Sequence, residues 1–566
     1  MPKKSIIMGK IKILNYFSLV WKQLERWIAI NKLPLSIALL VSLLYVVLFD
    51  VGVREFSGMA LVWKILYTTV QIFLFTLLLS RLKYVGGIIF ALANVIVIVL
   101  QYAKIVFSLD LSPAIVNATF QTTWNEVFPL INIYIVLAIS ACLSLSFLYI
   151  NWLNRKLIVA HNWWCLGGWL GLYVFYLLLP GMFAYKQPWV LCNTMTREIL
   201  ENPFLREHAE REYSWLWKKN VREHFLSPAF KYNRILSYTR DYFKNIDTQD
   251  PAVLASHAER EDEPMVFVLV IGESLRADHF SLFGYARETN PLLSKIPNLY
   301  GFPRFYSFQT GTSSSIYGIL TNADIEHPHA TMKSFASVLK KHKFKCSLIT
   351  SNYGVMTFFT AAHIQPSFTT FADSVTDCEY GNTPALKALS QAVNSSPRQL
   401  VVLQNGMGHF PYYCDERYKK YQPCDFNGDP PFQKKETMER MLNAYDNCVI
   451  GIDDFLARSI AILKDKRAVL LFVSDHGESF GENGRWSHCG PLTCREQRHI
   501  AACIWFSDKY RATNARQVEN ILSHRNQPLS HDHIYHTVIS VCDIQSQVQN
   551  PKLDLTNPEI ETAKEP

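Results

Sequence analysis

The stretch VFVLVIGES, residues 266–274, decides the fold of this chain. Its leading apolar residues run directly into Gly272, Glu273 and Ser274, a pattern typical of a strand that is buried on both faces in a parallel sheet. Open α/β sheets build their sites at the carboxyl ends of such strands. The sequence therefore predicts a sheet that carries Glu273 at its functional edge.

A second stretch has the same form. The run AVLLFV, residues 468–473, ends in Ser474, Asp475 and His476. An isolated Asp-His pair is more often a helix cap or a turn, but a second strand that also ends in a carboxylate favours a shared metal site. Carboxylate oxygens and an imidazole suit zinc or manganese.

The chain around these two strands alternates strand and helix patterns between about residues 265 and 545, which predicts an α/β domain with a mostly parallel sheet covered by helices. We expect a polar and poorly ordered tail at 546–566. The expected strands are 266–271, 346–350, 399–403, 468–473 and 501–506, and the expected helices are 333–341, 383–393 and 438–464.

The N-terminal part of the chain is far more apolar, and it predicts a transmembrane domain at 1–183. A helix needs about 20 apolar residues to cross a bilayer. The first candidate segment is short, and a buried core helix is its alternative explanation. The five candidate spans are about 34–49, 62–80, 85–107, 129–150 and 163–183.

The basic residues predict how these spans are oriented. Seven Lys and Arg residues precede the first span, whereas the loop at 50–61 has only Arg54 and the loop at 108–128 has none. The positive-inside rule then places the N-terminus in the cytoplasm and everything after about residue 184, including the α/β domain, on the outer side of the membrane. Because the basic excess lies beside the spans, the net charge of +8 does not indicate nucleic-acid binding. Residues 184–264 are expected to bridge the two domains with amphipathic helices and a linker.

Small hydroxyl residues form the run GTSSS at 311–315, before an apolar helix start. Such a run is often only an N-cap. A nucleophile here would gain from the helix N-terminus, which binds anions such as phosphate, and from a metal that lowers its pKa. His409 and His488 follow the strands at 399–403 and 468–473. A lone His is usually structural, but these two could bind a phosphoryl oxygen or a second metal.

Four stretches together resemble the phosphoethanolamine transferases of Gram-negative inner membranes, which belong to the alkaline phosphatase and sulfatase-like superfamily. The resemblance covers nearly the whole chain and implies five spans followed by a periplasmic catalytic domain. The stretches are GESLRADHFSLFGYARETNP, SDHGESFGENGRWSHCGP, IAACIWFSDKY and SHDHIYHTVISVCDI.

The resemblance also implies site residues. The zinc ligands of the family map to Glu273, Asp475 and His476, together with the nucleophile. The family nucleophile is the last Thr of a Cys-Gly-Thr-x-Thr run, and Ser314 takes that place in this chain.

The match departs from the family pattern around the nucleophile. Thr312, Ser313 or Ser315 would take the role if the alignment shifts. The two Cys residues that flank this run in the family are replaced by Thr310 and Leu320, so the loop has to be held by packing rather than by a disulfide.

Other positions match substrate-binding residues of the family. His409 and His488 match histidines that bind phosphate or a second zinc. The outward loop at 108–128 resembles the headgroup-binding loop, with Asn117, Thr122 and Glu126 as the matching residues.

The expected function is transfer of phosphoethanolamine from phosphatidylethanolamine, through Ser314, to lipid A or another envelope glycan. We expect a monomeric multi-pass protein that binds Zn²⁺ at one tight site. Whether a second Zn²⁺ binds is left undecided by the sequence, and Mn²⁺ is less suited than Zn²⁺. A glycerophosphate or other phospho-alcohol transferase, similar to lipoteichoic acid synthases, is one alternative. A catalytically inactive membrane binding protein is another. A sulfatase is disfavoured because the Cys489 and Ser395 stretches lack the Arg of the sulfatase motif.

Overall fold

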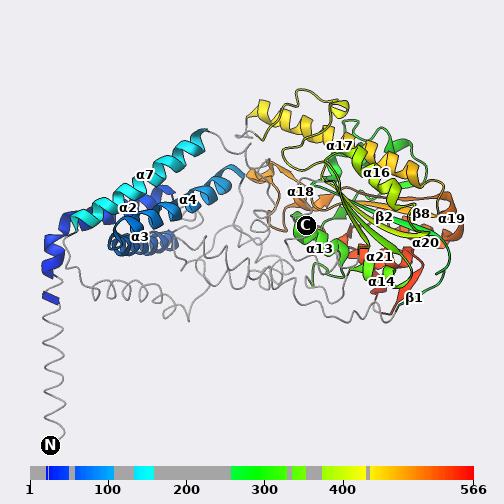
Figure 1. The fold of residues 1–566 in the computed structure, drawn as a ribbon, viewed down its shortest axis with the longest axis horizontal. Helices are drawn as coiled ribbons and strands as arrows, with labels where there is room; N and C mark the ends of the chain where they lie inside the picture. Colours follow the sequence, from blue (N-terminus) through cyan, green and yellow to red (C-terminus); the bar gives the residue numbers. More distant parts are fainter. Residues whose placement is uncertain are drawn as a thin grey trace, which may run out of the picture. The chain divides into compact units, whose positions relative to one another are not determined.

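The structure is a computed structural model, and the chain divides into two compact units, each described by itself below (Figure 1). One unit holds residues 1–102 and 132–231, and the other holds 103–131 and 232–566. The residues that the structure describes are 21–22, 25–49, 58–107, 133–157, 256–327, 334–351, 372–428, 434–547 and 549–566.

Long apolar helices form the described part of the first unit. They are α2 (Lys32–Phe49), α3 (Gly58–Ser80), α4 (Lys83–Phe107) and α7 (Ile133–Lys156). Polar groups join three of them: Asn94 accepts a hydrogen bond from Tyr45 and donates one to Ser146, at 2.9 and 2.8 Å. Hydrogen bonds of this kind are a common way to hold helices together in a membrane.

These helices coincide with the first four predicted spans, although the fourth helix begins and ends later than expected. Among the described residues, the segment Val136–Lys156 is long and apolar enough to cross a membrane. The shorter apolar helical segments are Lys32–Val47, Thr68–Ser80 and Lys83–Val95. The fifth predicted span at 163–183 and the bridge up to residue 255 lie outside the described residues.

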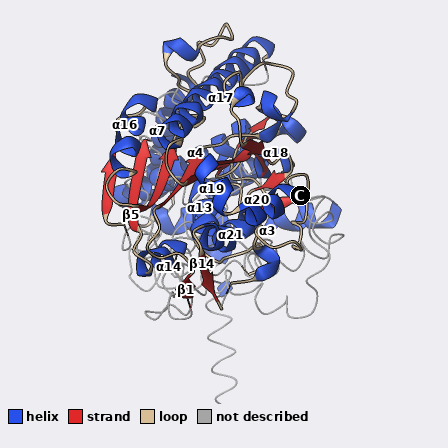
Figure 2. Cartoon of the chain, turned by 90° about the vertical axis from the view of Figure 1, so that its right-hand side faces the viewer, coloured by secondary structure: helices blue, strands red, loops and turns tan. Residues whose placement is uncertain are grey.

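A seven-stranded sheet forms the centre of the second unit (Figure 2). Strand β2 lies in the middle, pairs in parallel with β7 and β8, and all three are buried along their length. On one side of β2 the pairing stays parallel to the edge of the sheet. On the other side, the strand next to β8 pairs antiparallel with both of its neighbours. The strand order is β3 (Leu299–Gly301), β12 (Ala502–Phe506), β8 (Ala468–Ser474), β2 (Met265–Gly272), β7 (Arg398–Asn405), β5 (Lys345–Ser351) and β6 (Ser374–Asp377).

All five strands and three helices that the sequence predicted here are confirmed, with bounds shifted by a few residues. Helices cover both faces of the sheet (Figure 2). One group is α16 (Asn382–Ala392) with the long α17 (Lys435–Leu463). The opposite group is α13 (Thr312–Leu320), α14 (Phe335–Lys341) and α21 (Ile534–Val541). Phe267, Leu269 and Ile271 of β2 join the apolar core under this second group, which fixes β2 against α13.

Shorter elements complete the unit. They are β1 (Ser256–Ala258), β4 (Phe305–Tyr306), β9 (Ser479–Phe480), β10 (Trp486–Ser487), β11 (His499–Ile500), β13 (Leu529–Ser530), β14 (Ile544–Ser546), α18 (Arg495–Arg498), α19 (Asp508–Thr513) and α20 (Ala515–Ser523).

The polar tail is a folded part of this unit, where the composition suggested a poorly ordered end. His533 donates a hydrogen bond to the carbonyl of Glu561 at 2.9 Å, and the amide of Ala563 donates to Pro528 at 2.9 Å. Tyr306 donates to the Glu565 carboxylate at 2.7 Å. Because backbone groups take part in these bonds, a composition count does not detect them.

Candidate active site

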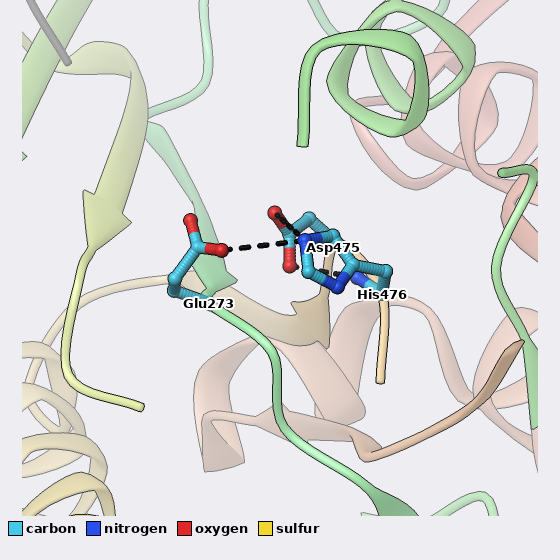
Figure 3. Close-up of side chains that lie close together, drawn as sticks. All are labelled: Glu273, Asp475 and His476. Atoms are coloured by element: carbon cyan, nitrogen blue, oxygen red, sulfur yellow. Dashed lines mark hydrogen bonds and ion pairs between the residues drawn. The ribbon is translucent and has the colours of Figure 1, made fainter. Parts of the chain in front are cut away.

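The ends of β2 and β8 meet, as the sequence predicted. The pairing places Gly272 opposite Ser474, so the residues that follow, Glu273 and Asp475, leave the sheet at the same edge. Together with His476 they form a group whose ligand atoms all lie within 4.8 Å of one another (Figure 3). All three side chains are fully buried.

His476 is oriented by its own backbone. Its Nδ1 lies 2.8 Å from the carbonyl of Gly477, so a neutral ring donates from Nδ1 and keeps Nε2 as an acceptor. Nε2 lies 3.4 Å from Glu273 Oε1 and 3.5 Å from Asp475 Oδ2. Bonds of this kind from the second ring nitrogen are what orients histidines that bind metals.

The three residues fit a divalent cation. Glu273 Oε2 and Asp475 Oδ2 are buried and have no hydrogen-bond partner among the described residues. Burial, reinforced by the charge of Glu273, raises the pKa of Asp475. Burial opposes the protonated form of His476, but the two carboxylates beside it outweigh this and raise its pKa. Two buried carboxylates that face one imidazole leave excess negative charge, which a bound cation would neutralise.

A hydroxyl group contacts this triad. Helix α13 begins at Thr312, with Gly311 as the N-cap residue. Thr312 Oγ1 lies 3.2 Å from Glu273 Oε1 and 3.1 Å from His476 Nε2. The structure thus places a hydroxyl at a helix N-terminus, where backbone N–H groups favour an anion such as phosphate.

The contacts single out a different hydroxyl from the one that the resemblance implies. Ser314 lies in the same helical turn, but its Oγ donates to the carbonyl of Gly311 at 3.2 Å. Ser315 also turns away, since its Oγ donates to Gln309 at 3.1 Å. Among the hydroxyl side chains described in this turn, Thr312 is the one with contacts to the triad. The Ser313 side chain lies outside the described part of the chain.

The two predicted histidines lie beside the triad. The His488 ring centroid is 4.5 Å from that of His476 and 6.2 Å from that of His409. His488 Nδ1 lies 3.4 Å from Glu478 Oε2. Both rings come from the sheet edge that carries the triad, so they could contact a group bound there. The predicted headgroup residues Asn117, Thr122 and Glu126 lie outside the described residues.

Sequence reasoning missed two residues that belong to this site. Glu478 is fully buried, and its Oε1 has no hydrogen-bond partner among the described residues. It stands two residues after His476 in the sequence, which was the available signal. Tyr445, on α17, donates to the carbonyl of Ser274 at 2.7 Å and accepts from the amide of Arg276 at 2.8 Å. It fixes the turn after Glu273, and no local motif indicates this.

Gly408 allows the loop that carries His409 to approach the backbone of Glu273 closely. A Cβ atom at this position would lie 2.3 Å from the carbonyl oxygen of Glu273, and the φ of Gly408 is +113°. Only glycine adopts this backbone conformation readily and leaves the space free. The run Gly406-Met-Gly-His409 therefore carries His409 to the edge of the triad.

The sequence of this chain is similar to those of known proteins. A family model described as Sulfatase matches residues 266–544. The phosphatidylethanolamine transferase Mcr-1 of Escherichia coli is 30% identical over 286 residues, which is 46% of this chain and 52% of Mcr-1. The phosphoethanolamine transferase EptA of Escherichia coli K12 is 26% identical over 315 residues, or 51% of this chain and 55% of that protein.

Over about half of its length, this chain is similar to phosphoethanolamine transferases and to the Sulfatase family model. The matches span about half the length of these curated relatives. The integral membrane lipooligosaccharide phosphoethanolamine transferase A of Neisseria meningitidis has the same fold, with a TM-score of 0.69 and 22% identity over 92% of this chain and 98% of that chain. The periplasmic domain of EptC from Escherichia coli, in complex with Zn, matches 56% of this chain and 92% of its own, with a TM-score of 0.50 and 24% identity.

Proposed function

We propose that this chain is a phosphoethanolamine transferase that transfers phosphoethanolamine from phosphatidylethanolamine to lipid A or another envelope glycan. The observation that carries the proposal is the contact of a hydroxyl at the N-terminus of α13 with both Glu273 and His476. The relatives described above, a phosphatidylethanolamine transferase and a phosphoethanolamine transferase, support the same reaction for this chain.

Glu273, Asp475 and His476 would hold the metal, and the EptC domain in complex with Zn supports zinc as its identity. A divalent cation bound there would lower the pKa of the adjacent hydroxyl and neutralise charge on the phosphoryl group. The protein side chains supply the rest of the site. Asp475 and His476 are held in place by backbone hydrogen bonds, so the donor set is formed before substrate binds.

The transfer would proceed in two steps through the same hydroxyl. In the first step, the hydroxyl oxygen forms a bond to phosphorus and the bond from phosphorus to the diacylglycerol oxygen breaks. The proton of the hydroxyl ends on the diacylglycerol alcohol. In the second step, an oxygen of the acceptor glycan attacks the same phosphorus, the bond to the side chain breaks, and the acceptor proton restores the hydroxyl.

Thr312 and Ser314 are the two candidates for this hydroxyl, each on a specific observation. The contacts with the triad favour Thr312. The family run places the role on Ser314, which lies in the same turn of α13. The other groups have matching roles: the N–H groups at the start of α13 would hold phosphoryl oxygens, and His409 and His488 would bind the same group from the other side.

The apolar helices would keep the site beside lipid headgroups, in a multi-pass inner-membrane protein with its catalytic domain in the periplasm. The direct test is mass spectrometry of envelope lipids from cells with and without the gene. We expect lipid A or a glycan to gain phosphoethanolamine only when the gene is present. A glycerophosphate group instead would identify a different transferase, and unchanged lipids beside intact zinc binding would indicate a binding protein.

A further inference from the structure

The loop that carries His488 is in an unfavourable backbone conformation. Ser487 and Cys489, the two neighbours of His488, both have left-handed backbones, with φ of 66° and 64°. Residues other than glycine adopt this conformation rarely, and they keep it only where surrounding groups hold them. Something outside the loop must therefore stabilise it.

Thr310 holds this loop from the side of the hydroxyl run. Its carbonyl accepts from the amide of Cys489 at 2.6 Å, and its Oγ1 donates to the carbonyl of Gly490 at 2.6 Å. Thr310 is 2% exposed, so water does not compete for these bonds. The carbonyl and the hydroxyl of Thr310 thus bond to the two residues that follow His488.

Gln497 holds the same loop from the other side. Its Oε1 accepts from the amide of Gly490 at 2.7 Å, and its Nε2 donates to the carbonyl of Ser487 at 2.9 Å. Gln497 is 1% exposed and comes from α18. The backbone on both sides of His488 is therefore fixed by two buried residues, and only Thr310 belongs to the segment that leads into α13.

We propose that Thr310 is a positioning residue that sets the distance between His488 and the start of α13. The inference rests on the proposed function, in which His488 binds the phosphoryl group that the α13 hydroxyl attacks. Thr310 stands two residues before Thr312 and bonds to the two residues after His488. Any shift of the loop relative to the helix must break the bond from its hydroxyl to Gly490.

Three variants of the zinc-loaded full chain in detergent test this role. T310V keeps the shape of the side chain and removes the hydroxyl, and T310S restores the hydroxyl. The matched control is T321V, because Thr321 is also buried, follows the far end of α13, and donates to the carbonyl of Tyr317 at 2.7 Å. Thermal unfolding, transfer kinetics and the Kd for inorganic phosphate by calorimetry are measured for each.

We expect T310V to weaken phosphate binding about tenfold, the effect of one buried hydrogen bond, and to lower kcat. T310S should bind phosphate as the wild type does. T321V should lower the melting temperature as T310V does, while phosphate binding and kcat stay at wild-type values.

Equal phosphate affinity in T310V and T321V would overturn the inference, and so would a T310S protein as weak as T310V. Wild-type protein that binds no phosphate would overturn it too. The proposed function is judged separately, by whether wild-type protein transfers phosphoethanolamine, so the two can fail independently.

Discussion

The amide of Ser274 donates a hydrogen bond to Oδ1 of Asp475 at 3.0 Å, which ties the second residue after β2 to the first residue after β8. Ser274 itself has a left-handed backbone, with φ of 60°. The other oxygen, Asp475 Oδ2, has no hydrogen-bond partner among the described residues and lies 3.5 Å from His476 Nε2. The geometry of the triad is therefore set by the backbone of two adjacent parallel strands, and its side chains need little rearrangement to bind a metal.

Removing the imidazole of the triad should remove the metal. H476A takes away one of three buried ligand groups and leaves two facing carboxylates, so we expect zinc content after mild purification to fall at least tenfold. H524A is the control, because His524 is also buried but donates to the carbonyl of Asn557, away from the triad. Metal analysis of both proteins decides. Equal zinc in H476A and H524A would disprove the metal site.

Two matched variants assign the nucleophile. T312A removes the hydroxyl that contacts Glu273 and His476, and S314A removes the hydroxyl that donates to Gly311. Because Thr312 is the residue that contacts Glu273 and His476, we expect T312A to abolish the phosphoethanolamine adduct and S314A to retain it. Peptide mass spectrometry after incubation with phosphatidylethanolamine reads this out. An adduct kept in T312A and lost in S314A would instead support the family assignment.

Tyr445 should stabilise the triad through its hydrogen bonds to the turn after Glu273. Y445F removes two buried hydrogen bonds, to Ser274 and Arg276, so we expect a loss of about 1–3 kcal/mol in stability and weaker zinc binding. Y510F is the control, because the Tyr510 hydroxyl is buried and donates to Gln517 and Val541, away from the site. Chemical unfolding and zinc titration are compared. Zinc affinity lowered equally in both variants would contradict a specific role of Tyr445.

Asp532 should make stability depend on pH. Burial, and next the charge of Asp324, raises the pKa of Asp532 to about 7 in the folded protein. The folded state then holds its proton to higher pH than the unfolded state, so stability is lost as pH rises from about 4 toward 7. D532N removes this loss. The melting temperature of D532N relative to that of the wild type should therefore increase as the pH rises from 5 to 8. The exposed control D465N should show no such trend, and a constant difference for D532N would refute the prediction.

The sequence predicted the sheet and its functional edge because those features are local. The apolar runs that end in Glu273 and Asp475 predict buried strands, and parallel strands place their carboxyl ends at one edge. Strand bounds, the major helices and the triad all followed from these patterns. The four described apolar helices followed from the length of the apolar segments.

The remaining features depend on contacts between distant residues. Which hydroxyl of the GTSSS run contacts the triad is set by where α13 begins, and Gly311 as N-cap residue turns Thr312 toward Glu273. The sequence of the run does not determine at which of its residues the helix begins. The roles of Tyr445 and Thr310 likewise come from bonds to backbone groups more than 150 residues away, for which no spacing rule exists.

The most direct test of the central claim is the intact mass of the full-length protein incubated in vesicles that contain phosphatidylethanolamine. We predict a phosphoethanolamine adduct on the first turn of α13 in wild-type protein, and none in a protein with E273Q and H476A, whose site cannot hold the metal. An adduct of the same yield in that double variant, or one mapped outside residues 312–315 in the wild type, would contradict the proposal.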